Sequence, residues 1–79
     1  MHSINNPTQI GATLQGRRKQ LKLSQTDVAG RLGLSQNRLS ELESHPETLT
    51  VEQLLALLNA LGLEMSLGER SAGKHKAEW

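Results

Sequence analysis

Three polar residues in the middle of the chain have the pattern of helix N-caps, and they divide this region into short helices. Ser24, Ser35 and Thr50 each stand just before a run with apolar residues at helical spacing. Asp27 follows Ser24 and Gln53 follows Thr50 at the capping-box spacing. The pattern predicts two short helices close together, after Ser24 and Ser35, and another after Thr50.

A further helix is predicted to begin at Pro7, because Asn6 is a good N-cap and proline suits the first helical position. Ile10, Leu14 and Leu21 give this segment an apolar stripe at helical spacing. The chain therefore contains four predicted helices.

The helices after Ser24 and Thr50 are expected to end at Gly33 and Gly62, where the chain needs a left-handed residue. The segment 54–61 is apolar on more than one face, so it is either central in the fold or part of an interface. The leucines of this segment are Leu54, Leu55, Leu57, Leu58 and Leu61. The residues expected to face inward from the two helices before it are Val28, Ala29, Leu32, Leu39 and Leu42.

The core of this protein has to be aliphatic. The 79 residues include no Cys, Phe or Tyr and a single Trp, so no disulfide or thiolate-bound metal can hold the fold together. One domain is expected from this length, and so small a core favours oligomerisation.

Beyond residue 62 the apolar period changes from that of a helix to that of a strand. Leu63, Met65 and Leu67 alternate with polar residues. No second strand candidate exists in the sequence, so we expect this strand to pair with the same strand of another copy or with a partner's sheet edge. The expected organisation is an N-terminal arm (1–6), a helical domain (7–62), a dimerising strand (63–67) and a disordered tail (68–79).

Positive charge gathers near the start of the chain. Residues 1–26 carry four basic side chains and no acid, whereas residues 27–70 carry seven acids and three basic side chains. A basic end can meet phosphates, and a solvated helix face is the alternative. No apolar stretch approaches the roughly 20 residues that span a bilayer, and no signal-peptide pattern is present, so we expect a protein of the cytoplasm.

Enzymatic chemistry finds little support in the residue types present. His2, His45 and His75 are far apart in the sequence, which argues against a metal site. No Gly-rich loop ends in Gly-Lys-Ser/Thr, so nucleotide binding has no support. We expect neither a catalytic residue, nor a metal, nor a cofactor.

The two helices after Ser24 and Ser35, joined by a tight turn at Gly33, match the helix-turn-helix motif. In that motif the second helix lies in the DNA major groove with its N-terminal residues at the base edges. Here those residues are Gln36 and Asn37, whose amides can pair with adenine. Polar residues at the start of a short helix are common and need no function. The spacing between the two helices, however, favours a role for Gln36 and Asn37 in contacting DNA bases.

At these positions the chain resembles the Cro/C1-type (XRE) helix-turn-helix family, over roughly residues 10–62. The matching residues are Ser24-Gln25, Ala29, Leu32-Gly33, Ser35-Gln36, Leu39-Ser40 and Leu42-Glu43. Within the family it looks most like HipB-type antitoxins, in Pro7-Thr8-Gln9, in the segment 63–67 and in the ending Glu78-Trp79. The implied fold is all-α: a compact, lambda-repressor-like domain of four to five helices, with a short C-terminal β-strand paired between subunits.

The resemblance implies a role for each matching residue. Gln25 would contact a phosphate, Gln36 would read a base with Asn37 and Ser40 beside it, and Ser35 would cap the second helix and touch phosphate. Arg18 and Glu43 occupy positions that pair as a structural salt bridge in family members. Arg38 either reaches phosphate or lies across the surface. Arg17, Lys19 and Lys22 are phosphate candidates, with a solvated face as the alternative.

The resemblance also implies partners. HipB-type proteins are homodimers that repress their own operon on palindromic operator DNA and bind a HipA-like kinase toxin, in the bacterial cytoplasm at the nucleoid. Leu63, Met65 and Leu67 would then mediate dimerisation, and Trp79 would dock in a groove of the toxin. Two alternatives stay open: a phage-type regulator without a toxin, and a protein-interaction module that mainly binds the toxin.

Overall fold

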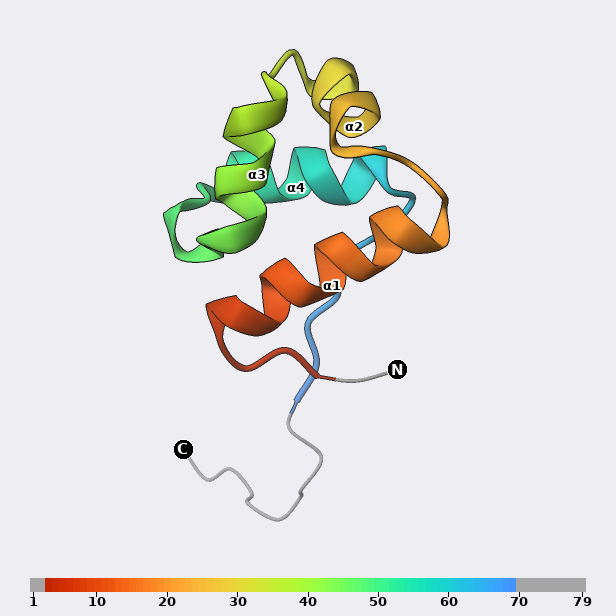
Figure 1. Cartoon of the computed structure of the whole chain (residues 1–79). Coiled ribbons are helices and arrows are strands. Elements are labelled where there is room, and N and C mark those ends of the chain that lie inside the picture. The colour runs from red at the N-terminus through yellow and green to blue at the C-terminus, as the bar shows by residue number, and fades with distance from the viewer. Residues whose placement is uncertain (1–2, 70–79) are drawn as a thin grey trace.

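The computed structural model describes residues 3–69 and arranges them as an all-α fold, which confirms the predicted fold class. Its elements in chain order are α1 (Pro7–Gln20), α2 (Gln25–Leu32), α3 (Gln36–Ser44), the 3₁₀ turn η1 (Pro46–Thr48) and α4 (Val51–Ala60). Figure 1 shows α4 running behind the other helices, above α1 and below α2, with α3 in front of its left end. None of the helices in residues 3–69 is long and apolar enough to cross a membrane.

Each helix begins where its N-cap predicts. The side chains of Asn6, Ser24 and Thr50 each accept a hydrogen bond from the backbone N–H three residues later, and each of those residues bonds back to the cap. The bond that the Ser24 N–H donates to Asp27 lowers the pKa of this carboxyl below its usual value, with help from the Ser24 hydroxyl and the nearby Arg31 charge. Local side-chain chemistry therefore sets the helix starts.

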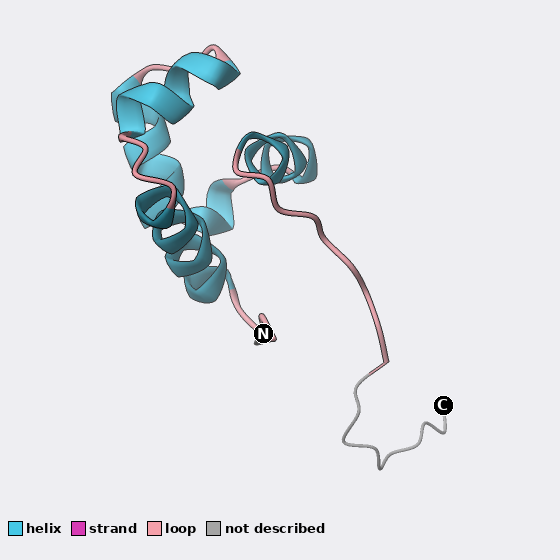
Figure 2. Ribbon diagram, turned by 90° about the vertical axis from the view of Figure 1, so that its right-hand side faces the viewer, coloured by secondary structure: helices cyan, strands magenta, loops and turns pink. Residues whose placement is uncertain are grey.

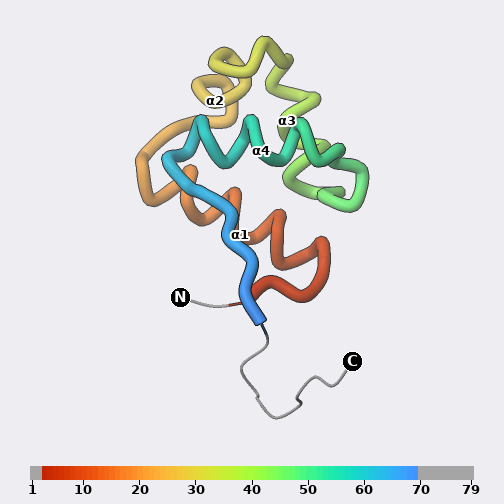
Figure 3. The backbone as a smooth tube through the Cα atoms, turned by 180° about the vertical axis from the view of Figure 1, so that it is seen from behind, coloured from red at the N-terminus to blue at the C-terminus, as the bar shows by residue number. Residues whose placement is uncertain are grey.

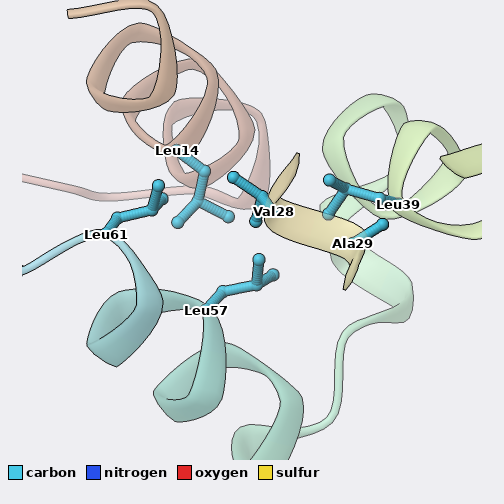
Figure 4. Close-up of a cluster of buried hydrophobic side chains, with 6 residues drawn as sticks. All are labelled: Leu14, Val28, Ala29, Leu39, Leu57 and Leu61. Carbon is cyan, nitrogen blue, oxygen red and sulfur yellow. The ribbon is translucent and has the colours of Figure 1, made fainter. Parts of the chain in front are cut away.

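The core is made of small aliphatic side chains contributed by all four α-helices. Six fully buried members form one cluster, namely Leu14, Val28, Ala29, Leu39, Leu57 and Leu61, which converge in Figure 4, and Leu42 is fully buried as well. Helix α4 turns Leu57 inward, leaves Leu54 and Leu58 half-buried, and exposes Leu55 at 45%. Only one face of α4 therefore packs against the other helices, and Leu55 lies outside the core.

Helix α1 crosses α3 at a point where no side chain fits. A Cβ added at Gly11 would lie 2.5 Å from the backbone oxygen of Glu43 and 3.1 Å from Pro46 Cγ. A Cβ added at Gly16, on the same helix, would meet nothing within 4 Å. The two glycines of α1 therefore differ: Gly11 allows the crossing, whereas Gly16 faces open space.

The segment after α4 runs away from the helices. The Leu63 N–H bonds to the Leu58 carbonyl at 2.8 Å and its side chain packs against the core. Beyond it, the chain leaves from the α4 side of the molecule (Figure 2) and, seen from behind, runs down across α1 (Figure 3).

The strand predicted at 63–67 is not formed within a single chain. No strand is assigned anywhere in residues 3–69, because no other segment of this range offers backbone groups to pair with it. Pairing with a second copy stays a prediction. The predicted disordered tail lies almost wholly outside the described residues, and so does Trp79.

Candidate nucleic-acid interface

The candidate site is the pair α2 and α3, joined at the top of the molecule in Figure 1 by a three-residue turn. Gly33 in this turn has φ 70°, the left-handed conformation expected there. The Ser35 side chain accepts a hydrogen bond from the Arg38 N–H at 3.0 Å and caps α3. This geometry is the helix-turn-helix arrangement that the sequence predicts.

Two glutamine amides meet where these helices begin. Gln36 Nε2 donates to Gln25 Oε1 at 2.6 Å, so the first residue of α3 is bonded to the first residue of α2. Gln36 and the neighbouring Asn37 are exposed. The site thus presents amide donors and acceptors, together with the free backbone N–H groups of a helix N-terminus, which suits base edges and phosphates.

Glu43, near the end of α3, holds this amide pair from behind. Its Oε1 accepts from Gln25 Nε2 at 3.0 Å and from the Arg18 guanidinium at 3.2 Å, while its Oε2 accepts from Arg18 Nε at 2.8 Å. The side chains of Arg18 and Glu43 are only 9% and 5% exposed. Arg18 and Glu43 thus form a buried, two-pronged ion pair.

The same guanidinium reaches the loop between α1 and α2. Arg18 Nη1 donates to the Leu23 carbonyl at 3.1 Å. A continuous series of hydrogen bonds therefore runs from Gln36 through Gln25, Glu43 and Arg18 to the backbone of Leu23. These contacts hold α1, α2, α3 and the α1–α2 loop in one arrangement at the candidate surface.

The other predicted site residues differ in their exposure and in whether they have a partner within the protein. Arg38 pairs with Glu41 on its own helix at 3.0 Å, with both side chains well exposed. Ser40 is half-buried, and Lys19 is exposed near the end of α1. Within the described residues no side-chain hydrogen bond is formed by Asn37 or Lys19, so both are accessible to a ligand.

Arg17 is predicted to contact phosphate, but in the structure its guanidinium group is hydrogen-bonded within the protein. Its Nε donates to the Leu61 carbonyl at 2.9 Å and its Nη1 to Gln20 at 3.1 Å. Arg31 donates to the neighbouring Ala60 carbonyl at 3.2 Å. Two guanidinium groups, from α1 and α2, thus satisfy carbonyls at the C-terminal end of α4.

Sequence reasoning missed these two contacts and also the Gln25–Glu43 hydrogen bond. Arg17 and Leu61 are 44 residues apart, and no motif links them. The Gln25–Glu43 contact could have been anticipated, because the predicted Arg18–Glu43 pair already brings the Glu43 carboxylate close to the start of α2. The structure adds that one carboxylate serves both partners.

The described part of the chain offers no candidate metal-binding site. Residues 3–69 contain no group of three His, Asp or Glu side chains that could hold a metal ion. The arrangement at α2 and α3 is one of hydrogen-bond donors and acceptors without a cluster of metal ligands.

Comparisons with known proteins point to one kind of molecule. The helix-turn-helix family model matches residues 14–67. Antitoxin HipB of Escherichia coli (strain K12) is 30% identical over 64 residues, which cover 81% of this chain and 73% of that protein. Antitoxin HipB of Escherichia coli O6:H1 is 28% identical over 76 residues, covering 95% and 81%.

Solved structures agree with the sequence matches. A HipA–HipB–O2–O3 complex contains a chain that superimposes with a TM-score of 0.80 at 28% identity, covering 87% of this chain and 97% of that one. A HipB–O1–O2 complex gives a TM-score of 0.80 at the same identity, covering 87% of this chain and all of the other.

Proposed function

Because the chain belongs to the helix-turn-helix family, and within it to the relatives of antitoxin HipB, we propose that it is an operator-binding repressor and antitoxin. It binds double-stranded DNA upstream of its own coding sequence and neutralises a HipA-like kinase toxin. It acts in the bacterial cytoplasm, at the nucleoid, and carries out no catalysis of its own.

The observation that carries the DNA-binding proposal is the bonded pair Gln25–Gln36 at the starts of α2 and α3. With Gln25 holding it, the Gln36 amide is presented in one orientation, which favours the two-bond pairing with adenine in the major groove. Gln25 itself offers its backbone N–H and the positive end of α2 to a phosphate. Asn37 and Ser40 lie beside Gln36, and Arg38 and Lys19 supply flanking charge.

A palindromic operator follows from a dimeric protein. Met65 is 47% exposed and Leu67 is 92% exposed, which suits residues that a second copy covers. We propose that segment 63–67 pairs between subunits, so that the two α3 helices reach successive major grooves on one face of the DNA.

The toxin partner is supported by the comparison in which HipA accompanies HipB. Trp79 lies outside the described residues, and its docking in a toxin groove remains a prediction from the sequence. Co-purification with a kinase encoded beside this gene tests the partner, and Trp79→Ala tests the residue. Loss of the toxin complex with intact DNA binding supports the assignment, whereas an unchanged complex refutes it.

A footprint on the DNA upstream of its own coding sequence tests the DNA-binding proposal. We expect protection of a palindrome that is lost steeply as the salt concentration rises, because bound Lys and Arg side chains displace counterions from phosphates. Equal binding to a scrambled duplex of the same length would contradict a sequence-specific repressor.

A further inference from the structure

Three helices of this chain end with the same backbone motif. At the ends of α1, α2 and α4 the N–H of a leucine bonds to the carbonyl five residues earlier, at 3.0, 2.9 and 2.8 Å. These leucines are Leu23, Leu34 and Leu63, and all three pack against the core. The residue before each leucine is left-handed, with φ of 61°, 70° and 69°.

The left-handed residue is glycine in two of the three motifs and lysine in the third. Gly33 and Gly62 pay no steric cost there, whereas Lys22 carries a Cβ that crowds the backbone. Lys22 is the one non-glycine residue with positive φ in residues 3–69. The chain thus uses a less stable residue at the end of α1 than at two equivalent positions, and such a departure points to a use for its side chain.

The Lys22 charge is exposed at this position. Its side chain forms no hydrogen bond or ion pair within the described residues, unlike Arg17 and Arg18 nearby, which are engaged by Leu61 and Glu43. A favourable interaction between the Lys22 charge and the carbonyl end of α1 does not explain this residue, since Lys19 already places an unpaired positive charge in the last turn of the described helix.

The position of Lys22 is tied to the candidate nucleic-acid interface. It precedes Leu23, whose carbonyl is bonded to the Arg18 guanidinium, and this guanidinium is linked through Glu43 and Gln25 to Gln36. In Figure 2 α1, α2 and the loop between them lie on the left side, and segment 63–69 leaves from the right. Lys22 belongs to this loop and stands three residues before the start of α2.

We propose that Lys22 contacts a phosphate of the bound DNA, and that the left-handed conformation is retained for this contact at the expense of stability. This inference rests on the DNA-binding function proposed above. It adds a contact outside the α2–α3 motif, on the DNA backbone next to the phosphate that Gln25 approaches. Such a contact holds the protein on the duplex without reading its sequence.

Three substitutions of Lys22 separate the effect of its backbone conformation on stability from the effect of its charge on DNA binding. Lys22→Gly removes the strain and the charge, so the Tm of the DNA-free protein should rise by about 4–8 °C while DNA affinity falls about ten-fold. Lys22→Gln keeps the backbone strain and loses the charge, so its Tm should stay near that of the wild type and its DNA affinity should fall as in Lys22→Gly. Lys22→Arg should preserve both.

Salt dependence identifies the contact as one with phosphate. The slope of log affinity against log salt concentration should fall by about one for each subunit in Lys22→Gly and Lys22→Gln. The probes are the upstream fragment and a scrambled duplex of equal length, and both should lose affinity equally. Arg31→Gln removes one charge from the far end of α2 and should leave the slope unchanged. Gly33→Lys places the same strain at the end of α2 and should lower the Tm.

Two different failures are distinguishable. If the wild-type protein binds neither duplex in a salt-dependent way, the proposed function fails and this inference fails with it. If the wild type binds but Lys22→Gly and Lys22→Gln bind equally well with the same salt slope, only the Lys22 contact is refuted. A lowered Tm of Lys22→Gln with unchanged DNA binding also refutes it, and makes Lys22 a stabiliser of α1.

Discussion

Glu43 accepts hydrogen bonds from two side chains with different tasks. Arg18 neutralises its charge inside the domain, and the Gln25 amide donates to the same carboxylate at the candidate nucleic-acid interface. A residue that stabilises the fold therefore also orients the amide pair. The stability of the fold and the orientation of the amide pair are coupled at this point, because both depend on one buried anion.

Removing the cation of this pair should destabilise the protein strongly. Arg18→Met leaves the Glu43 carboxylate buried without its partner, and breaking a buried pair costs about 3–5 kcal/mol in free energy of unfolding. Arg38→Met is a matched control, because Arg38 and Glu41 pair on the surface with side chains 43% and 66% exposed, and such pairs contribute about 1 kcal/mol or less. Urea denaturation of both variants measures the difference. Equal losses would show that the Arg18–Glu43 pair contributes no more than a surface pair.

Truncating the base-reading amide should reduce specificity more than general DNA affinity. Gln36→Ala is expected to cost roughly 1–3 kcal/mol on the cognate operator and little on a scrambled duplex, since the lost contact is with a base edge. Gln15→Ala removes an exposed amide from α1 and should change neither. Titrations on both duplexes provide the measurement. If Gln36→Ala loses affinity for both equally, Gln36 does not read a base.

At the scale of elements, the close approach of α1 to α3 positions the whole interface. The backbone of α1 at Gly11 lies directly against the carbonyl of Glu43, so the helix that carries Arg18 is held next to the helix that carries its partner. Guanidinium groups of Arg17 and Arg31 hold the end of α4 in a similar way. Helix crossings and helix ends therefore determine where the site residues lie.

The two glycines of α1 should respond to alanine with opposite signs. Gly11→Ala forces a Cβ against backbone and should cost about 1–3 kcal/mol in free energy of unfolding, as overpacking does. Gly16→Ala places its Cβ in open space on a helix, which should stabilise the protein by about 0.5–1 kcal/mol. Thermal or chemical denaturation decides. A neutral Gly11→Ala variant would mean that α1 and α3 move apart without cost.

At the scale of the whole molecule, two surfaces of the fold differ in polarity. The α2–α3 surface is polar, whereas α4 and the segment after it expose Val51, Leu55, Met65 and Leu67. A DNA surface on one side and an apolar surface on the other match a dimer that presents two recognition helices to one duplex. Their separation should be one turn of DNA, about 34 Å, in a palindromic operator.

Charge placed on the extended segment should separate the subunits. The double variant Met65→Lys, Leu67→Lys puts two cations where an apolar strand face is predicted, so we expect monomers and weaker operator binding. Ser66→Lys is the matched control, since it lies in the same segment at the opposite alternation and is already exposed. Sedimentation equilibrium gives the oligomeric state. If the double variant remains a dimer, the interface lies elsewhere, with Val51 and Leu55 of α4 as the next candidates.

The sequence by itself determined where the four α-helices begin, where α2 and α4 end, the helix-turn-helix unit and the residues at its exposed start. These depend on interactions over three to five residues: Ser24 with Asp27, Thr50 with Gln53, and the left-handed turn at Gly33. Such interactions join residues that are close in the sequence, so they can be predicted without knowledge of the tertiary structure.

Only the tertiary structure decided how the charged residues are used. Four basic side chains precede residue 27, and sequence reasoning treated Arg17, Lys19 and Lys22 alike as phosphate candidates, setting apart only Arg18 by resemblance. The fold brings Arg17 to a carbonyl 44 residues away and Arg18 to a carboxylate 25 residues away. It leaves the ammonium group of Lys22 exposed beside the start of α2. Which cation is buried depends on how helices cross, and crossing is determined by packing between residues that are distant in the sequence.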